Sequence, residues 1–370
     1  MVTMSKSNDK AEIFIAGGGP VGLAAAIELT RRGYTPRIVD PDPNVSPESR
    51  AMAINSRTLD LLEPSGVTDL LIAAGQKMKK LVIRRNQTII TTIDLTKIPH
   101  RFNFLLVLPQ SDTEKILESK LAEMGVKLER NLSLTNFKPG PRIGLELSDG
   151  KKSESNFLIG ADGAHSLVRH NLGLGFEGES DQQEFGLCDV HLEDWPYGYD
   201  TIVLTILDTH LAPFIPMSEG FGRFISTIGH SLNNLPPDAK VKKVDWETDF
   251  KISYRQASTY QKDNIFLAGD AAHIHSPVGG RGMNLGIEDA CWLAWLIEQG
   301  RSAEYTSLRH PVGTQVLKFT QRFTSFAKNR GVMQDILIRS LAPLIPLFPA
   351  VQSQIFRTLS ALDTPAPPWL

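Results

Sequence analysis

The sequence feature that most constrains the fold is a set of three glycines, Gly17, Gly19 and Gly22, between an apolar run and a helical stretch. The preceding EIFIAG is typical of a buried strand, and TPRIVD after the helical stretch predicts a second strand that ends at Asp40. Glycines in this order permit a tight turn, close approach of the backbone to a pyrophosphate, and close packing of helix on strand. The pattern therefore predicts a Rossmann-like dinucleotide-binding unit.

The helix after this turn begins with Pro20 and Val21, and proline suits a first helical turn because its missing N–H would have no partner there. The N-terminus of this helix is expected to face the anion. Asp40 is placed to accept hydrogen bonds from an adenosine ribose. NAD and FAD both fit these residues, and a glycine-rich turn that binds nothing is the alternative.

Composition favours a soluble protein of about two domains. The chain has 370 residues, 41% of them hydrophobic, and a formal net charge of −2 without a lysine or arginine block, which argues against a nucleic-acid-binding surface. The N-terminal MVTMSKSNDK lacks the apolar core of a secretory signal, and no apolar run is long enough to span a bilayer. Cys188 and Cys291 lie far apart, without neighbours at metal-ligand spacing. We therefore expect no disulfide framework, no metal site and a cytoplasmic location.

Helical and strand patterns alternate along the first part of the chain. We expect a helix over 61–80, two strands around a turn in LVIRRNQTIITTIDL, and a helix that Ser111 or Asp112 caps and Gly125 ends. From about Phe176 to Tyr254, short apolar runs broken by turns predict a β-rich insertion. The strand, turn and helix pattern returns at DNIFLAGD, so the nucleotide-binding domain is expected to be discontinuous.

A second signature follows that return, as Gly269-Asp270 and then HSPVGGRGMN. A strand that ends in Gly-Asp places a carboxylate at the carboxyl edge of the sheet, where it can hold a ribityl hydroxyl. Pro277, Gly279, Gly280 and Gly282 then give a strip of backbone on which a flat ring can lie. The helix that begins near Met283 directs its positive end at that ring, which suits the negative charge of a reduced flavin.

Three motifs together carry a resemblance to a known family. GGGPVGLAAAIELTRRG, ADGAHSLVR and IFLAGDAAHIHSPVGGRGMNLGIEDA, in this order, resemble the single-component FAD-dependent aromatic hydroxylases of the p-hydroxybenzoate and phenol hydroxylase type, from about Ile13 to Pro311. The resemblance implies an α/β fold with a Rossmann-like FAD-binding domain, an inserted β-rich substrate domain and C-terminal helices. The implied division is 10–75, 105–175 and 258–310 for the FAD-binding domain, 76–104 and 176–257 for the substrate domain, and 311–370 for the helical segment.

The resemblance also implies site residues. Those assigned to FAD are Gly17, Gly19, Pro20, Val21, Gly22, Asp40, Arg50, Gln110, Asp162, Gly269, Asp270, Pro277, Gly280, Gly282, Met283 and Asn284. Arg50 matches an arginine over the FAD phosphates near the NADPH path, Pro277 lies against the ring, and Arg281 is a cation that can help to hold the anionic reduced flavin. The alternatives are a surface role for Arg50, a solvent-facing Arg281, a helix cap for Gln110 and a turn cap for Asp162.

Two further groups are less specific. His273 and His275 invite assignment as acid or base, but a histidine that is hydrogen-bonded within the protein near the cofactor is the expected role, and no serine, histidine and acid triad is readable. The β-rich insertion is expected to cover the substrate. Its candidate substrate contacts are His210, Phe214, Pro216 and Phe224, with Trp195, Tyr197 and Tyr199 nearby, and an ordinary core position is the alternative for each aromatic residue.

The reaction that the resemblance implies has two halves, in which NAD(P)H reduces FAD and O2 then forms a flavin C4a-hydroperoxide that oxygenates an electron-rich, phenol-like ring. The alternatives are epoxidation, Baeyer-Villiger oxidation, a halogenase or a reductase on the same fold, an NAD dehydrogenase, and a non-catalytic flavin-binding interaction protein. A halogenase is disfavoured because no W-x-W-x-I-P motif is present.

The apolar LAPLIPLFP is expected to pack on its own domain rather than on a membrane or partner. The substrate, the choice of NADH or NADPH and the oligomeric state stay open.

Overall fold

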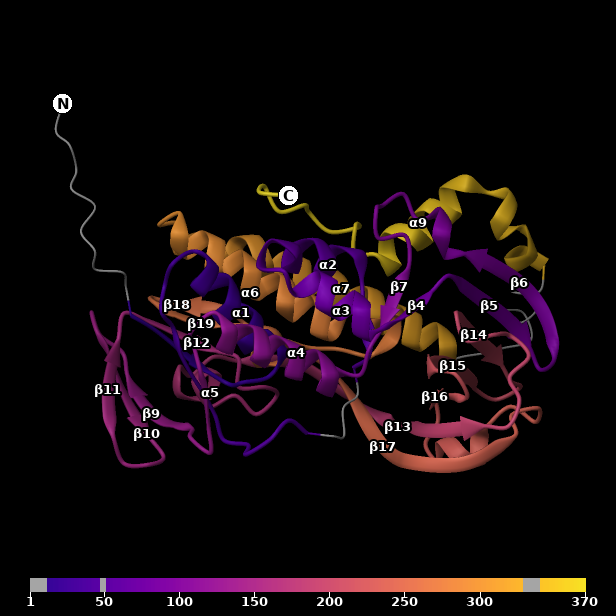
Figure 1. Cartoon of the computed structure of the whole chain (residues 1–370), viewed down its shortest axis with the longest axis horizontal. Coiled ribbons are helices and arrows are strands. Elements are labelled where there is room, and N and C mark those ends of the chain that lie inside the picture. The colour runs from indigo at the N-terminus through magenta and orange to yellow at the C-terminus, as the bar shows by residue number, and fades with distance from the viewer. Residues whose placement is uncertain (1–11, 47–50, 329–339) are drawn as a thin grey trace.

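The computed structural model describes residues 12–46, 51–328 and 340–370. Two large sheets dominate these residues, with helices above both of them (Figure 1). The first has six strands in the order β18-β19-β12-β1-β2-β8. Their bounds are Gln261–Lys262, Ile265–Leu267, Phe157–Gly160, Ile13–Ala16, Arg37–Asp40 and Leu128–Arg130. All neighbours run parallel except β18, so this is the open parallel sheet that the first glycine motif predicted.

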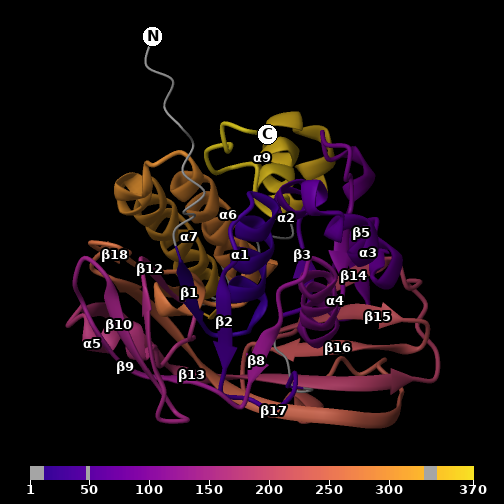
Figure 2. The same ribbon diagram turned by 60° about the vertical axis from the view of Figure 1, so that its left-hand side comes forward.

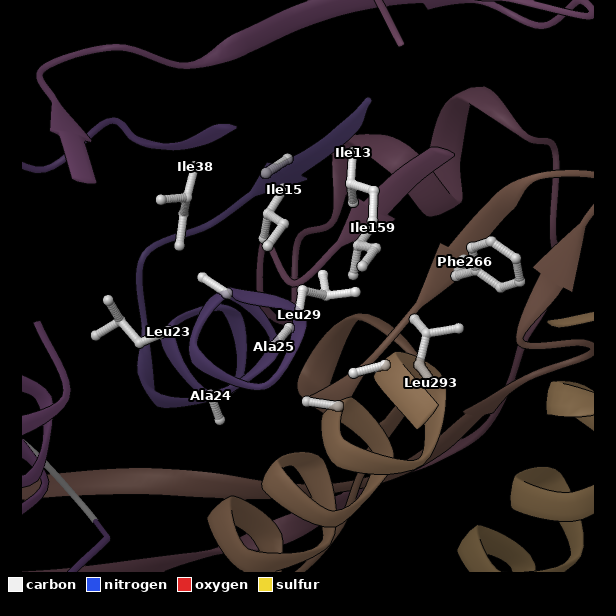
Figure 3. Packing of buried hydrophobic residues seen from close by; sticks show 14 of the residues in the cluster. Ile13, Ile15, Leu23, Ala24, Ala25, Leu29, Ile38, Ile159, Phe266 and Leu293 are labelled. Atoms are coloured by element: carbon white, nitrogen blue, oxygen red, sulfur yellow. The ribbon is translucent and has the colours of Figure 1, made fainter. Parts of the chain in front are cut away.

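Two helices pack side by side on one face of this sheet. They are α1 (Pro20–Arg31) and α6 (Gly282–Glu298). Figure 3 shows Leu29 of α1 beneath Ile15 and Ile159 of the strands, and Leu293 of α6 close to Phe266. Alanines fill three consecutive positions of α1, Ala24 to Ala26, and all are fully buried. These small side chains allow close contact between the helix and its neighbours.

Further helices and two small sheets belong to this domain. The helices are α2 (Ser56–Leu62), η1 (Glu63–Ser65), α3 (Val67–Ala74), α4 (Gln110–Glu123) and α5 (Leu167–Asn171). One small antiparallel sheet contains β9 (Leu134–Lys138), β10 (Ile143–Leu147) and β11 (Lys152–Ser155). Another, in the order β3-β7-β4, contains Ala53–Ile54, Leu105–Val107 and Gln76–Met78.

The second large sheet has eight strands in the order β20-β17-β13-β16-β15-β14-β5-β6. Their bounds are His273–Ile274, Val241–Ala257, Phe176–Leu192, Phe221–Ser226, Leu211–Ser218, Thr201–Ile206, Lys80–Arg85 and Thr88–Asp94. Only the β14–β5 pair is parallel among these neighbours. Its edge strand β20 lies just after the Gly-Asp turn, so the second sheet is joined directly to the second glycine signature. Figure 2 shows this sheet below the helices of the first domain.

The described C-terminal residues contain α7 (Tyr305–Lys328), η7 (Ala342–Leu347) and α9 (Pro349–Leu359). The apolar LAPLIPLFP forms η7 and the start of α9. Ala342 is buried and Ile345 packs on the core, whereas Leu341, Leu347 and Phe348 are exposed. Only part of this segment therefore packs on its own domain, although the sequence predicted this packing for all of it. Of the helices within the described ranges, none is both long and apolar enough to cross a membrane.

The fold class is the one that the sequence predicts, but two local expectations are wrong. The expected helix over 61–80 ends at Ala74, because Gly75 stops α3 and β4 then pairs with β7. The N-cap of α4 is Pro109, without a side-chain cap, so neither Ser111 nor Asp112 caps this helix. The Gln110 N–H donates to Ala51 O instead (3.0 Å), which ties the start of the helix to a neighbouring segment.

Candidate active site

The first glycine turn joins β1 to α1 and is shaped by close backbone contacts. Gly17 has φ +108°, and its N–H donates to Val39 O of β2 (2.9 Å). A Cβ on Gly17 would overlap the carbonyl oxygen of Ala161, and one on Gly22 would overlap the carbonyl oxygen of Gly17. A Cβ on Gly19 would meet nothing within 4 Å. Gly17 and Gly22 are therefore needed by the turn itself, whereas Gly19 faces open space, as an approach to a phosphate requires.

Two carboxylates lie beside this turn. Asp40, at the end of β2, accepts the N–H groups of Gly18 (2.6 Å) and Asp42 (2.9 Å). Asp162 follows β12, and its Oδ2 accepts the Val168 N–H (3.1 Å) while its buried Oδ1 has no hydrogen-bond partner. Burial raises the pKa of the Asp162 carboxyl. One oxygen of Asp162 therefore caps the start of α5, which agrees with the turn cap given above as the alternative. The other oxygen is left for a donor from outside the chain.

The Gly269-Asp270 turn meets the first glycine turn. Gly269 has φ +63°, and a Cβ there would lie 2.8 Å from Cγ2 of Val21, in the first turn of α1. Gly286 of α6 approaches the same valine, because a Cβ on it would lie 2.6 Å from Cγ2 of Val21. Asp270 is exposed at this edge of the sheet. The structure therefore brings together two motifs that lie about 250 residues apart, as the sequence predicted.

Arg169 joins the third motif to the same place. This buried arginine of α5 donates from Nη1 to Ala271 O (3.0 Å) and from Nη2 to Ala164 O (2.8 Å). It thereby links the loop that contains Asp162 to the turn that contains Asp270. No role for Arg169 was predicted from ADGAHSLVR, although an arginine a few residues after an Asp-Gly pair is a visible signal in the sequence.

The second glycine turn runs from Pro277 to the start of α6. Gly279 and Gly280 have φ +77° and +62°, in the left-handed region that favours glycine. A Cβ on Gly280 would lie 2.7 Å from Cβ of Ala53 in β3. Asn284, buried in the first turn of α6, donates to Gly280 O (2.6 Å) and Ala53 O (2.7 Å) and accepts the Asn55 N–H (3.0 Å). Asn284 is thus a bridge from this turn to β3.

Arg281 lies in this turn but its side chain does not face solvent, so that alternative is wrong. The residue is 2% exposed. Its Nη1 donates to Thr358 O (2.7 Å) and to Asp363 Oδ1 (2.9 Å), both in the C-terminal residues. The guanidinium of Arg281 is paired with Asp363 and points toward α9. This orientation does not support the expected role of Arg281 as a cation that holds the reduced flavin.

Two other expected residues have different outcomes. Arg50 lies outside the described residues. Gln110 begins α4, and its Nε2 donates to Glu114 Oε1 (2.7 Å), whose carboxyl has a pKa raised by burial. The Gln110 side chain is therefore bonded within the first turn of its own helix, as expected if this residue belongs only to the capping region of α4. Its role beside the cofactor stays a prediction.

His273 and His275 stack with their ring centroids 6.2 Å apart. His273 Nε2 lies 2.6 Å from Asp289 Oδ2, and His275 Nδ1 lies 3.0 Å from Ser276 O, but His273 Nδ1 and His275 Nε2 are buried without hydrogen-bond partners. The expectation of a histidine hydrogen-bonded within the protein therefore holds for one nitrogen of each ring. Burial lowers the pKa of His275 to about 4, so the ring is neutral near pH 7.

A buried ionic cluster behind His273 was not anticipated from the sequence. Arg309 of α7 donates to Asp289 Oδ1 (2.6 Å) and Glu288 Oε1 (2.8 Å), and all three side chains are at most 2% exposed. Burial opposes the charge of Asp289, but Arg309 and His273 outweigh it and lower the pKa of this carboxyl. The cluster fixes α7 to α6 behind the second glycine turn.

The candidate substrate residues lie on the face of the eight-stranded sheet that is turned away from the cofactor domain. Phe214 and Phe224 are fully buried, with ring centroids 4.6 Å apart, and Trp195 packs 4.5 Å from Phe214. Their cluster contains residues of the insertion and β5 only, including Val82, Cys188, Val203, Tyr197, Tyr199 and Leu235. The expectation that Phe214 and Phe224 contact substrate is therefore wrong, and they are core residues, as the alternative stated.

His210 and Pro216 also lack support as substrate contacts. His210 is buried, with Nε2 2.8 Å from Asn234 O and Nδ1 3.0 Å from Thr209 Oγ1. Pro216 is two residues from Phe214 on β15, so it shares the face of that phenylalanine. Successive side chains of a strand point to opposite faces of its sheet, and the tertiary structure shows which face of β15 meets the cofactor domain.

The opposite, inner face of this sheet meets the cofactor domain. The apolar residues of that face are Leu81, Ile83, Ile202, Ile215 and Met217, and they pack with Met78, Leu105 and Val107 of β4 and β7 and with Phe356 of α9. Farther along the sheet, Phe250 and Phe185 pack with Leu317 of α7. The inner face between these two contacts belongs to β13 and β16, and it includes Leu187 and Ile225.

Arg223 and Asp189 form a buried ion pair on this inner stretch. Arg223 lies in the same cross-strand row as Ile215 and Asp189. Its Nε and Nη2 donate to the two Asp189 carboxylate oxygens (2.6 and 2.7 Å), and it is 3% exposed. This pair was not predicted from the sequence, from which Phe224, one position away, was the candidate, although an arginine between apolar strand residues is a visible signal. The pair leaves this part of the wall without net charge.

Comparisons with known proteins agree with this geometry. A sequence model of the family described as "FAD binding domain" matches residues 10–232 and 230–320. The chain belongs to this family. It is 31% identical to 6-methylpretetramide 4-monooxygenase of Streptomyces rimosus, over 97% of this chain and 70% of that protein. It is also 31% identical to pentachlorophenol 4-monooxygenase of Sphingobium chlorophenolicum, over 87% of this chain and 66% of that protein, which is slightly less than two thirds of that relative's length.

A solved structure has the same fold as this family member. The p-nitrophenol 4-monooxygenase of Pseudomonas putida DLL-E4 superposes with a TM-score of 0.85, covering 95% of this chain and 98% of that one at 21% identity. The chain is thus a member of a family of FAD-dependent monooxygenases with the p-hydroxybenzoate hydroxylase-like fold that the sequence predicted.

The residues present fit FAD on three observations. Gly19 faces open space, and the N-cap of α1 has no side-chain capping bond, so the first N–H groups of this helix are not taken by a cap. Asp162 Oδ1 is buried without a partner. The Pro277–Gly282 strip carries two left-handed glycines at the N-terminus of α6. Gly17 to Gly22 would hold the pyrophosphate, and the second turn would hold the flavin ring.

Bound FAD supplies the hydride acceptor and the centre that activates oxygen. The chain supplies orientation and charge. Backbone N–H groups at the N-terminus of α6 would stabilise negative charge on the reduced ring, since the helix dipole points there. The inner face of β13 and β16 would cover the reacting position and exclude water from it. Within the described residues, no group of three or more histidine, cysteine or acidic side chains is arranged to hold a metal ion.

Proposed function

We propose that the chain uses NAD(P)H and O2 to insert one oxygen atom into a small, phenol-like aromatic compound. The observation that carries this proposal is the convergence of three separate motifs at the sheet edge formed by β1, β12 and β19, opposite a largely apolar inner face of the second sheet. Relatives named for pentachlorophenol and p-nitrophenol support a phenolic substrate class. No serine, histidine and acid triad is readable from the spacing of the sequence, which agrees with chemistry that the cofactor performs.

The substrate proposed is a neutral or weakly acidic ring rather than a carboxylate. The buried guanidinium of Arg223 is bonded through two donors to Asp189, so its charge is already matched. The neighbouring positions on this face, Ile215, Ile225 and Leu187, are apolar. An apolar, uncharged wall favours a flat ring, because burying an unpaired carboxylate there would cost several kcal/mol.

The test is turnover of the FAD-loaded protein with NADPH or NADH in air, across a panel of phenols and matched benzoates. We expect a phenol to accelerate NAD(P)H oxidation and to gain one labelled atom from 18O2 by mass spectrometry. Accelerated oxidation that yields only hydrogen peroxide, or an oxygenated benzoate with no reaction of any phenol, contradicts the proposal. A yellow protein that no tested compound accelerates would favour the non-catalytic alternative.

A pair of variants tests the assignment of faces. Ile225→Ala truncates a side chain on the inner face, and Val203→Ala truncates one on the outer face. Ile225→Ala should raise KM for the best phenol by about 10-fold or more, because it removes three carbon atoms and even one methylene lost from a hydrophobic pocket costs about 1–3 kcal/mol. Val203→Ala should lower thermal stability with KM unchanged. The opposite pattern would return the substrate to the outer face.

We also infer a reducing, cytoplasmic compartment. Cys188 and Cys291 are free and buried, and burial raises the pKa of the Cys188 thiol to about 11. Neither thiol is therefore exposed as a reactive thiolate. Detection of the native protein in a cytosolic fraction, without disulfide-linked species on a non-reducing gel, tests this inference.

A further inference from the structure

The C-terminal segment, defined as residues 349–370, contacts both ends of α6. At the N-terminal end, Arg281 donates to Thr358 O and to Asp363 Oδ1. At the C-terminal end, Trp369 stacks on Trp295 (4.9 Å between centroids, 28° between planes) and packs edge-on against Trp292 (5.1 Å). The segment therefore runs alongside the helix that begins at the second glycine turn. Figure 2 shows the C-terminus and α9 above α2.

Other bonds fix the middle of this segment. The Arg57 N–H of α2 donates to Ser360 O (3.2 Å), and Gln315 Nε2 of α7 donates to Asp363 O (3.1 Å). Phe356 is 5% exposed and packs with Met52, which precedes β3. The residues that hold the segment thus belong to elements that also surround the second glycine turn.

Arg281 is the direct connection between the segment and that turn. Its guanidinium is 3% exposed and the Asp363 carboxylate 15%, so water screens this pair weakly. Thr358 lies in the last turn of α9, and its carbonyl oxygen accepts the Ala361 N–H (3.3 Å) just past the helix. Arg281 is a second donor to this oxygen and places a cation at the negative end of the α9 dipole. The residue immediately before it, Gly280, holds the left-handed conformation that the turn requires.

We propose that Arg281 is a positioning residue, through which the C-terminal segment holds the second glycine turn in the conformation that binds FAD. The turn then has two anchors, Asn284 to β3 on one side and Arg281 to the C-terminal segment on the other. Binding of FAD and docking of the segment are therefore coupled, and by linkage each strengthens the other by the same factor. The inference rests on the cofactor of the family and not on the proposed substrate.

The first experiment measures the FAD dissociation constant of Asp363→Asn by quenching of flavin fluorescence. We expect FAD to bind more weakly by about 5-fold to 150-fold, the usual range of coupling between sites. The matched control is Asp238→Asn, which removes the Arg84–Asp238 ion pair at the outer face of the second sheet. This control should bind FAD like the natural protein. Equal affinity of Asp363→Asn and the control overturns the proposal.

The second experiment uses the natural sequence and needs no variant that might fail to fold. Hydrogen exchange of residues 349–370 is compared between the FAD-free and FAD-loaded protein. We expect slower exchange at Thr358 to Asp363 when FAD is bound, because linkage is reciprocal. Unchanged exchange in this segment, with slower exchange at Gly17 to Gly22, contradicts the coupling.

An exchange of charges separates positioning from a general loss of stability. Arg281→Asp and Asp363→Arg each place like charges together, whereas the double variant restores an ion pair. FAD affinity should fall in both single variants and recover by at least about 5-fold in the double variant. Recovery of the thermal midpoint without recovery of FAD affinity would show that the pair supports the fold alone.

Discussion

The two glycine turns differ in where their supporting contacts come from. The first turn is held by its own strand, helix and neighbouring strands, as Gly18 bonds to Asp40 only 22 residues away and Gly22 packs on Gly17. The second turn is held by residues distant in sequence. Asn284 bonds to Ala53, 231 residues away, and Arg281 to Asp363, 82 residues away.

Two similar glycine patterns can therefore be stabilised in different ways, one mainly by contacts close in sequence and the other by contacts distant in sequence. The hydrogen bonds that hold the first turn come from β1, α1 and β2, and the carbonyl group of Ala161, after the adjacent strand β12, packs against Gly17. The second turn depends on β3 and the C-terminal segment being in place. We therefore expect substitutions in the first turn to destabilise the fold of the cofactor domain. The effect of a substitution in the second turn should depend on the residues at its distant partners.

The largest effect is expected for Gly17→Ala. The new Cβ would overlap the carbonyl oxygen of Ala161 and force a residue with a side chain to φ +108°. Conformational strain of 1–2 kcal/mol and overpacking of 1–3 kcal/mol give a loss of about 4 kcal/mol in unfolding free energy. Urea unfolding measures this loss. The control is Gly125→Ala, at φ +86° with nothing within 4 Å of the new Cβ, which should lose only the strain. Equal losses would contradict the close contact.

Gly280→Ala is expected to lower the unfolding free energy, and a second substitution at Ala53 should restore part of the loss. The new Cβ would lie 2.7 Å from Cβ of Ala53, and the loss should be about 3 kcal/mol, combining strain and contact. In the double variant with Ala53→Gly, the next atom is Cα of residue 53 at 3.9 Å, so about 1 kcal/mol or more should return. Additive losses in urea unfolding would show that the second turn does not depend on β3.

The pH dependence of stability should report on the second turn through His275. Burial, with smaller contributions from His273 and Arg281, lowers the pKa of its imidazole from 6.5 to about 4. Between these values, the unfolded chain binds a proton that the folded chain does not, so stability is present above pH 6.5 and falls as the pH drops towards 4. The full shift is worth about 3 kcal/mol, and because the residue as a whole is only partly buried we reduce this to about 2 kcal/mol.

His275→Gln should reduce the stability difference between pH 6.5 and pH 4 by this amount in urea unfolding. His165→Gln, at an exposed position after β12, is the control and should leave the difference unchanged. An undiminished difference in His275→Gln would locate the acid sensitivity elsewhere.

The smallest effect on the fold is expected for Gly19→Ala in the first turn. Its φ is −72° and its Cβ would meet nothing, so the unfolding free energy of the FAD-free protein should change by less than about 0.5 kcal/mol. Binding of FAD should nevertheless weaken, because the methyl group occupies the approach of the pyrophosphate. Flavin fluorescence titration measures this. Unchanged FAD affinity would mean that Gly19 does not face the phosphates.

The comparison also explains which site residues the sequence could predict. Gly17, Gly22 and the Gly269 turn meet because parallel strands present their carboxyl ends at one edge of a sheet, which the order of elements implies. The placement of Phe224 and Arg223 could not be derived in this way. Alternation shows that they lie on opposite faces, but both faces of the second sheet are buried, so the pattern does not tell which one meets the cofactor domain.

The sequence by itself determined the parallel nucleotide-binding sheet, the β-rich insertion and the two glycine turns, because strand and helix periods and glycine spacing are local properties of a chain. Only the tertiary structure decided the direction of Arg281, the bridge by Asn284 and the inner face of the second sheet. Each of these depends on partners brought close by packing, and a side chain with several donors has no preferred partner until the fold has placed one beside it.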